Sequence, residues 1–264
     1  MISKANAAFG DEFSLWITGD LVNRGPDSRR ALELVRVLVE AGRAQYVLGN
    51  HEIFAISVGL GLRDLRPGDS VGDMLGAPDA AEWIDWLRSR PLVMPGEIGG
   101  QRFVMLHAAT DPDWSLDQLV EKAADIAERL SASRQSACDF LSQEPEAGTP
   151  RDHLGRLTRC RSVTPEGDWS SREPATPERA WHREWASRRH DYGIVYGHWA
   201  RQGLHVAEGL RGLDTGCVHH GRGRDGCLTA WLPEPGPRRE AARPFDAPDD
   251  RFWRIPARRR YYTG

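Results

Sequence analysis

Two short apolar runs end in the same way and constrain the fold of this 264-residue chain more than any other feature. The run LWIT (15–18) breaks at Gly19-Asp20 within LWITGDLVNRGP, and YVL (46–48) breaks at Gly49-Asn50-His51 within YVLGNHE. A strand that stops at glycine lets the backbone turn sharply, so the next side chain stands at the carboxyl edge of the sheet. Open α/β sheets place their chemistry at that edge, and both runs therefore predict a strand that ends in a functional site.

The residues between the two runs have the pattern of an amphipathic helix. Asp27 or Ser28 can cap a helix that extends to Ala41, with Leu32 and Val35 on its apolar face and Gly42 as its stop. The order strand (13–18), helix, strand (44–48) predicts a βαβ unit with two parallel strands. Asp20 and Asn50 should then lie side by side.

Two later strands repeat the pattern. Residues 102–106 form an apolar run that ends at His107, and residues 192–196 form one that ends at Gly197-His198. Helices are expected from about residue 52, from 79 to 90 and from 115 to 130, and antiparallel strands after residue 203. Residues 141–180 are rich in Pro, Ser, Gly and charge and are expected to form a long functional loop or insertion. The overall class is α/β.

The polar residues at the four strand ends share the chemistry of metal ligands. A carboxylate, an amide oxygen and imidazoles suit Mn, Fe, Co, Ni or Zn better than Ca, which takes more oxygen ligands. A single histidine after a strand is more often a packed, hydrogen-bonded side chain, but four such positions favour a metal site. One carboxylate such as Asp20 can bridge two ions that lie about 3.5–4 Å apart, so a divalent metal pair is expected.

Composition and charge limit the alternatives. The formal net charge of -3 argues against bulk nucleic-acid binding, and the four cysteines are widely spaced without a CxxC pair, which suits a reducing compartment. No apolar run reaches the roughly 18 residues of a membrane span. We therefore expect a cytoplasmic protein without a membrane partner. Residues 1–232 are interpreted as the domain, and residues 233–264, with eight arginines among prolines, as an extended or disordered tail.

The motifs GDLVNRGP, LGNHE, HAA, YGHWA and LDTGC follow the order found in the calcineurin-like metallophosphoesterases, whose phosphoprotein phosphatase branch the chain resembles. LGAPDAAEWIDWLRSRPL, RLTRCR and GLDTGCVHHG make it similar to the bacterial symmetrical diadenosine tetraphosphatases within that family. The resemblance covers about residues 9 to 232. It implies a sandwich of two mixed β-sheets flanked by helices, and a metal-dependent hydrolase that cleaves diadenosine tetraphosphate, a small dinucleoside polyphosphate, to two ADP.

The resemblance also implies roles for individual residues. Asp20 would bridge two metal ions such as Mn or Co, and Asn50, His107 and His198 would hold the second ion. His51 would protonate the leaving phosphate oxygen, and Asn23 would orient His51. Arg24 would clamp phosphate oxygens with its planar fork of donors, and Arg159 or Arg161 would supply a second phosphate contact.

One departure from the family is large. The family begins with a GDxHG motif on its first strand, and the 19 residues before Asp20 contain neither that motif nor any histidine. The first strand is thus expected to be missing, the first ion to be held poorly and the activity of this chain to be low. A start codon placed too late, a deliberate shortening and a true degeneration would each explain it. The remaining alternatives are a protein serine/threonine phosphatase and a non-catalytic phosphate-binding remnant.

Overall fold

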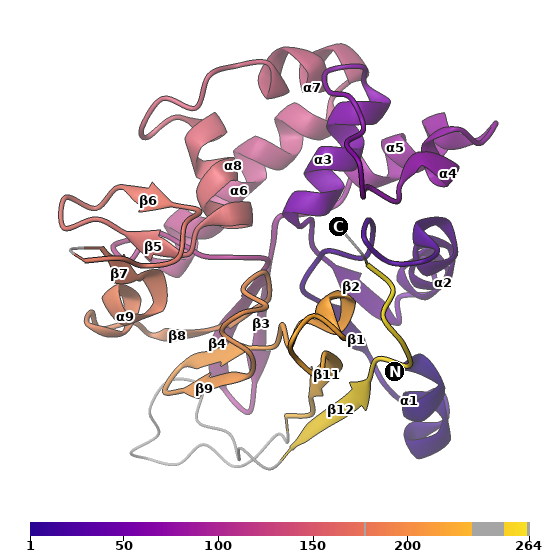
Figure 1. Cartoon of the computed structure of the whole chain (residues 1–264). Coiled ribbons are helices and arrows are strands. Elements are labelled where there is room, and N and C mark those ends of the chain that lie inside the picture. Colours follow the sequence, from indigo (N-terminus) through magenta and orange to yellow (C-terminus); the bar gives the residue numbers. More distant parts are fainter. Residues whose placement is uncertain (177, 234–250, 263–264) are drawn as a thin grey trace.

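The computed structural model describes residues 1–176, 178–233 and 251–262 (Figure 1). Its helices are α1 (Ile2–Phe9), α2 (Ser28–Glu40), α3 (Asn50–Gly59), α4 (Gly72–Leu75), α5 (Ala80–Arg88), α6 (Leu116–Ser131), α7 (Arg134–Leu141), α8 (Pro150–Arg159), α9 (Trp181–Ala186) and the 3-10 turn η1 (Cys217–His219). Its strands are β1 (Leu15–Ile17), β2 (Ala44–Tyr46), β3 (Val93–Ile98), β4 (Gln101–Leu106), β5 (Ser162–Val163), β6 (Trp169–Ser170), β7 (Arg179–Ala180), β8 (Tyr192–Tyr196), β9 (His205–Ala207), β10 (Leu210–Gly212), β11 (Cys227–Trp231) and β12 (Phe252–Pro256).

The predicted βαβ unit is confirmed. Strands β1 and β2 pair in parallel, with Trp16 opposite Gln45, and α2 connects them. The side chain of Asp27 accepts a hydrogen bond from the Arg30 N–H and caps α2, whose buried face carries Leu32 and Val35. Because the two strands run in the same direction, both following polar segments lie at one end of the pair.

The central sheet has five strands in the order β3-β4-β8-β10-β9. It is mixed, because β4, β8 and β10 run parallel to their neighbours while β3 and β9 pair antiparallel at the two edges. Strand β8 is buried along its whole length, as expected for a parallel strand covered on both faces. The expected strand at residues 102–106 is β4, and its end places His107 beside the end of β8.

A second layer packs on this sheet, but it is not a single mixed sheet as expected. It consists of the parallel pair β1–β2 and the separate antiparallel pair β11–β12. Trp16 of β1 packs on Phe103 of β4 with ring centroids 5.2 Å apart, and Val195 of β8 and Trp231 of β11 lie in the same cluster. The two layers therefore meet through apolar side chains.

The segment 141–180 differs from the predicted loop. It contains the whole of α8 and the small antiparallel sheet β6-β5-β7. Trp169 of β6 anchors the sheet by donating a hydrogen bond of 2.6 Å to Asp152 of α8. Strands of two residues are too short to show a period in the sequence, which is why the composition indicated only a loop.

Both ends of the described chain contain a helix or strand that the sequence did not predict. Residues 2–9 form α1, where little pattern was expected. The predicted domain boundary near residue 232 falls just after β11, and residues 234–250 lie outside the described part of the tail. Residues 252–256 form β12, which pairs with β11 from Phe252 to Pro256. Part of the tail thus belongs to the second layer.

Aromatic side chains fill much of the core. Trp83, Trp86, Trp181 and Trp185 are all buried, which confirms the packing role expected from their helical spacing. The four cysteines are free. None of the helices within the described residues has the length and apolar character needed to cross a bilayer.

Candidate metal and phosphate site

A buried carboxylate organises the loop after β1. Glu52, in the first turn of α3, is fully buried and accepts hydrogen bonds from the backbone N–H groups of Asp20 (2.9 Å), Leu21 (2.7 Å), Val22 (3.2 Å) and Gly49 (2.7 Å). Burial and the neighbouring Asp20 raise the pKa of Glu52, while the backbone donors favour its ionised form. One side chain therefore joins the ends of β1 and β2.

Asp20 adopts a left-handed backbone conformation with φ of 55°, a strained state for a residue with a side chain. Its Oδ1 accepts a hydrogen bond from the His51 N–H at the start of α3 (3.1 Å) and lies 3.3 Å from His107 Nε2. Burial would raise the pKa of Asp20, but the attraction of His107 and His51 holds that pKa well below its usual range. Asp20 is therefore a carboxylate that faces imidazoles.

His107 is oriented by the backbone of β1. Its Nδ1 lies 2.6 Å from the Thr18 carbonyl oxygen, which can only accept, so Nδ1 carries a proton and donates it, while Nε2 faces two further acceptors, Asn50 Oδ1 (3.2 Å) and Asp20 Oδ1 (3.3 Å). Burial disfavours a charge here, but the Asp20 carboxylate outweighs it and raises the pKa of His107 to about 9. The position thus attracts positive charge, whether a proton or a metal cation supplies it.

His198 is oriented in the same manner from the other side. It follows β8 with a left-handed φ of 65°, and its Nε2 donates to the carbonyl oxygen of Arg159 at the end of α8 (3.1 Å). Nδ1 is then left facing Asn50 Oδ1 at 2.9 Å. Burial lowers the pKa of His198 well below its ordinary value of 6.5, so its Nδ1 keeps a lone pair.

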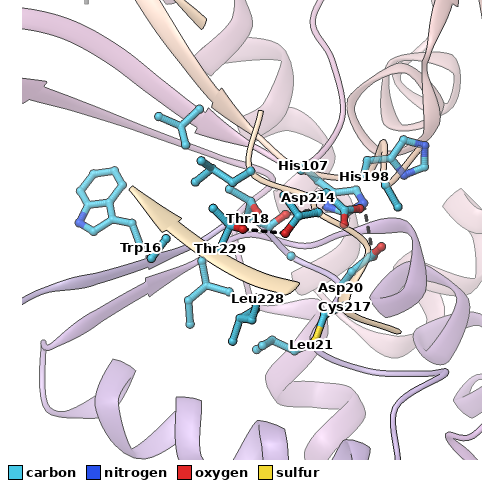
Figure 2. Close-up of a pocket in the computed structure, with 18 of the residues that line it drawn as sticks. Trp16, Thr18, Asp20, Leu21, His107, His198, Asp214, Cys217, Leu228 and Thr229 are labelled. Carbon is cyan, nitrogen blue, oxygen red and sulfur yellow. Dashed lines mark hydrogen bonds and ion pairs between the residues drawn. The ribbon is translucent and has the colours of Figure 1, made fainter. Parts of the chain in front are cut away.

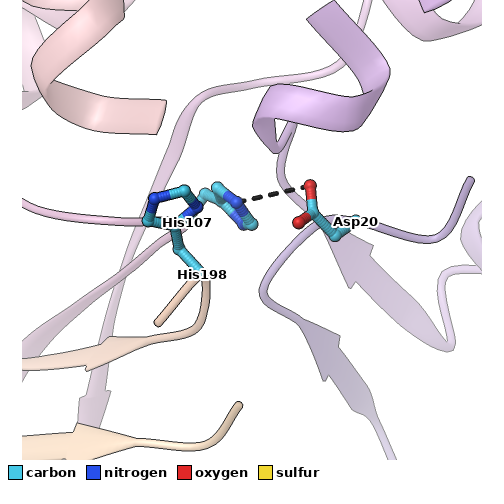
Figure 3. A group of neighbouring side chains, drawn as sticks. All are labelled: Asp20, His107 and His198. Atoms are coloured by element: carbon cyan, nitrogen blue, oxygen red, sulfur yellow. Dashed lines mark ion pairs between the residues drawn. The ribbon is translucent and has the colours of Figure 1, made fainter. Parts of the chain in front are cut away.

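These atoms form a set of electron-pair donors suited to a metal ion. Ligand atoms of Asp20, His107 and His198 all lie within 4.8 Å of one another, and the three side chains converge in Figure 3. Asn50 Oδ1 lies between the two imidazoles. Each imidazole is fixed by a backbone carbonyl on its far nitrogen, which is the usual support of a metal-ligating histidine. The residues therefore fit one divalent cation, the second ion of the metal pair predicted from the sequence.

The donor set opens into a cavity with a volume of about 1060 Å³ (Figure 2). Its polar end contains Asp20, Asn50, His51, His107 and His198, and its apolar end is lined by strands β1, β4, β8 and β11. Asp214, after β10, joins the polar end, where burial raises the pKa of its carboxyl group. The cavity has the size of a large small-molecule site.

The structure separates the three arginines expected to bind phosphate. Arg24 and Arg161 line the cavity. Arg159 does not: its guanidinium packs over Trp169, 5.6 Å from the ring centroid, and burial lowers its pKa. Arg159 contributes instead through its carbonyl oxygen, which holds His198. Arg201, which no motif singled out, also lines the cavity.

His51 lies where the motif placed it, but Asn23 does not contact it. The His51 Nε2 is 3.9 Å from Asp20 Oδ2, at the polar end of the cavity. The Asn23 amide donates to Asp69 (2.9 Å), and its oxygen accepts from the N–H groups of Arg24 and Ser70. Asn23 thus orders the loop that carries Arg24. The contact between Asn23 and His51 that the sequence led us to expect is not present among the described residues, and this expectation is corrected.

Sequence reasoning missed Glu52 and Asp214 as parts of the site. Both were present in the motifs, as the last letter of GNHE and the acid of LDTGC, but only the three-dimensional contacts assign them a position. For Glu52 the available signal was a capping pattern at the start of α3, which does not reveal hydrogen bonds to a loop about 30 residues earlier.

Comparison with known proteins agrees with this geometry. Residues 5–224 match the calcineurin-like phosphoesterase family. The chain is 38% identical over 220 residues to the symmetrical bis(5'-nucleosyl)-tetraphosphatase of Burkholderia mallei, and 37% identical to that of Burkholderia pseudomallei, in each case over 77% of this chain and 76% of the relative.

A crystal structure of a candidate diadenosine tetraphosphatase superimposes with a TM-score of 0.55 and 22% identity, over 86% of this chain and 81% of the other. At that identity the likeness concerns the fold. The family match covers most of the chain and includes every residue of the candidate metal site. Calcineurin-like phosphoesterases use divalent metal ions, and the donor set described above is of that type. The chain belongs to the calcineurin-like phosphoesterase family.

Proposed function

We propose that this chain is a metal-dependent hydrolase that cleaves diadenosine tetraphosphate symmetrically to two ADP. The observation that carries the proposal is the convergence of Asp20, Asn50, His107 and His198 with two arginines on one cavity. The names of the relatives, which share 38% identity over most of their length, support the choice of substrate. A nucleoside at each end of a tetraphosphate also suits a cavity of about 1060 Å³ with an apolar part.

Each residue of the site has a separate role in the proposed hydrolysis. The four donors would hold a divalent ion, which supplies positive charge that polarises a phosphoryl oxygen and lowers the pKa of water. Arg24 and Arg161 bind phosphate oxygens and place the central P–O–P bridge near the donors. Hydrolysis adds one water across that bridge, so the P–O bond between the second and third phosphates breaks.

His51 is assigned to the leaving group. The departing ADP oxygen gains charge as the P–O bond breaks, and the His51 Nε2 proton can be transferred to it. The Asp20 Oδ2 lies 3.9 Å from His51 Nε2, which places His51 beside the donor set. Each product is a nucleoside diphosphate, which requires that the cavity centre the tetraphosphate on the donor set.

Product analysis tests the proposal. The full chain is incubated with diadenosine tetraphosphate and Mn, and the nucleotides are separated by chromatography. ADP as the sole product supports the proposal, whereas ATP with AMP would show that a P–O–P bridge other than the central one is cleaved. Hydrolysis of a phosphoserine peptide in preference to the dinucleotide would instead identify a protein phosphatase, and binding without turnover would identify a phosphate-binding remnant.

A further inference from the structure

The C-terminal segment lies outside the family match, which ends at residue 224, yet it reaches the loop after β1 that carries Arg24. Strand β12 pairs with β11, and the segment then runs back toward the loops that follow β1 (yellow in Figure 1). The backbone of Ala257 donates to the Gly226 carbonyl, which fixes the direction of this return. The segment brings Tyr262 beside Arg24 and His219, which line the cavity.

The Tyr262 ring contacts two guanidinium groups. Arg24 lies 5.4 Å from the ring centroid and Arg222 lies 5.0 Å from it. The ring also packs against the Cα face of Gly68, where a Cβ would come within 3.3 Å of the ring. His219, which lines the cavity, meets the ring at 6.4 Å in a T-shaped arrangement. Tyr262 is therefore held from several sides.

The two arginines are free to bind an anion. Within the described part of the chain, no carboxylate forms an ion pair with the guanidinium of Arg24 or of Arg222, and their contacts there are with the Tyr262 ring. Two like charges on one ring repel each other, so the arrangement gains from a nearby anion. Burial lowers the pKa of His219, and the nearby charges of Arg24 and Arg222 lower it further.

The turn that carries Arg222 has a constrained backbone. Gly221 and Gly223 flank it, each with φ of 76°, and the Arg222 N–H donates to the His219 carbonyl oxygen. The Arg24 backbone is equally constrained, with φ of 59° and a hydrogen bond from its N–H to Asn23 Oδ1. Two constrained turns and one aromatic ring thus fix where the long side chains of Arg24 and Arg222 begin.

We propose that Tyr262 is a positioning residue that holds Arg24 and Arg222 as a paired clamp for the phosphate chain of the substrate beside the cavity. The inference rests on the proposed function for the identity of that substrate, but the clamp itself recognises polyphosphate. An ordered guanidinium loses less conformational freedom on binding than a mobile one, so the ring increases affinity without touching the reacting atoms.

The experiment compares full-length variants by calorimetric titration with inorganic tripolyphosphate and by kinetics with diadenosine tetraphosphate. Tyr262→Ala removes the ring, Tyr262→Phe keeps it, and Tyr261→Ala is the matched control. Tyr261 belongs to the same segment but contacts Arg259 at 5.3 Å, within the tail itself. Thermal unfolding of each variant checks that the fold is retained.

We expect Tyr262→Ala to raise the tripolyphosphate Kd and the KM about 5-fold with kcat unchanged, which is the effect of one or two surface cation–π contacts. Tyr262→Phe and Tyr261→Ala should stay within about 2-fold of the parent chain. In a chain that already carries Arg24→Ala and Arg222→Ala, adding Tyr262→Ala should have no further effect, because the ring acts through those arginines.

Three results would overturn the clamp: an unchanged Kd in Tyr262→Ala, an equal loss in Tyr261→Ala, or a full additional loss in the double-arginine background. The tripolyphosphate titration does not depend on turnover. If no variant, including the parent, hydrolyses diadenosine tetraphosphate while the Kd values follow the expected order, the proposed function fails and the clamp stands.

Discussion

Replacement of Glu52 by glutamine tests how much of the site depends on one buried carboxylate. Glu52 receives four backbone N–H groups, two on each oxygen: Leu21 and Val22 on Oε1, and Asp20 and Gly49 on Oε2. In Glu52→Gln one oxygen becomes an NH2 group, which cannot accept. Two buried N–H groups then face a donor, whichever way the amide is oriented.

The magnitude follows from the hydrogen bonds lost. Leaving one buried donor unsatisfied costs about 1–3 kcal/mol, so two such donors should lower the free energy of unfolding by about 3–5 kcal/mol. For a chain of this size that corresponds to a fall in Tm of roughly 6–20 °C. The two strand ends should also separate, with a loss of metal affinity of about 10-fold to 100-fold.

Urea unfolding and Mn titration of the purified chain measure both effects. Glu33→Gln is the control, since Glu33 forms exposed ion pairs with Arg29 and Arg30 on α2 and little change is expected. If Glu52→Gln unfolds at the same urea concentration as the parent chain and binds Mn equally well, the claim that Glu52 joins the ends of β1 and β2 is refuted.

Three further outcomes are expected. His51→Asn should lower kcat by about 10²-fold to 10⁴-fold while dinucleotide binding persists, and a loss confined to KM would reassign His51 to substrate contact. Gly19→Ala should abolish Mn binding, because Gly19 has φ of 90° and a Cβ would lie 2.8 Å from His107 Nδ1, while Gly25→Ala, with only the Asn23 oxygen at 3.9 Å, should bind Mn normally. Burial lowers the pKa of His182 to about 4 from 6.5, so the unfolded chain binds a proton at this residue at a higher pH than the folded chain does, and stability falls as the pH drops from 6.5 toward 4. His182→Gln should reduce that loss of stability when unfolding is measured as a function of pH. An unchanged dependence of stability on pH would contradict this expectation.

The βαβ unit and the four strand ends could be predicted because each depends on local sequence. A run of apolar residues followed by glycine and a polar side chain indicates where a strand ends, and parallel connection then brings distant ends together. Asp20 and Asn50 line the same cavity, and the His51 N–H, next to Asn50, donates to Asp20, as expected on that argument alone. His107 and His198 met them because their strands, β4 and β8, are neighbours in the sheet.

The features that were missed depend on partners far apart in the sequence. Strand β12 is defined by its pairing with β11, and the residues of β12 alone do not indicate that partner. Arg159 looked equivalent to Arg161 in the TRCR motif, but Arg159 ends α8 and turns onto Trp169. Asn23 was expected to act on His51, whereas its amide satisfies Asp69 and Ser70 from a segment more than 40 residues away.

Metal content per chain tests the central claim most directly. The purified protein is equilibrated with Mn, dialysed, and analysed for bound metal, together with a variant that carries both His107→Ala and His198→Ala. We expect close to one tightly held ion per chain in the parent protein and none in the variant, because Asp20, Asn50, His107 and His198 form one donor set. A parent chain without bound metal, or a variant that retains it, would contradict the account.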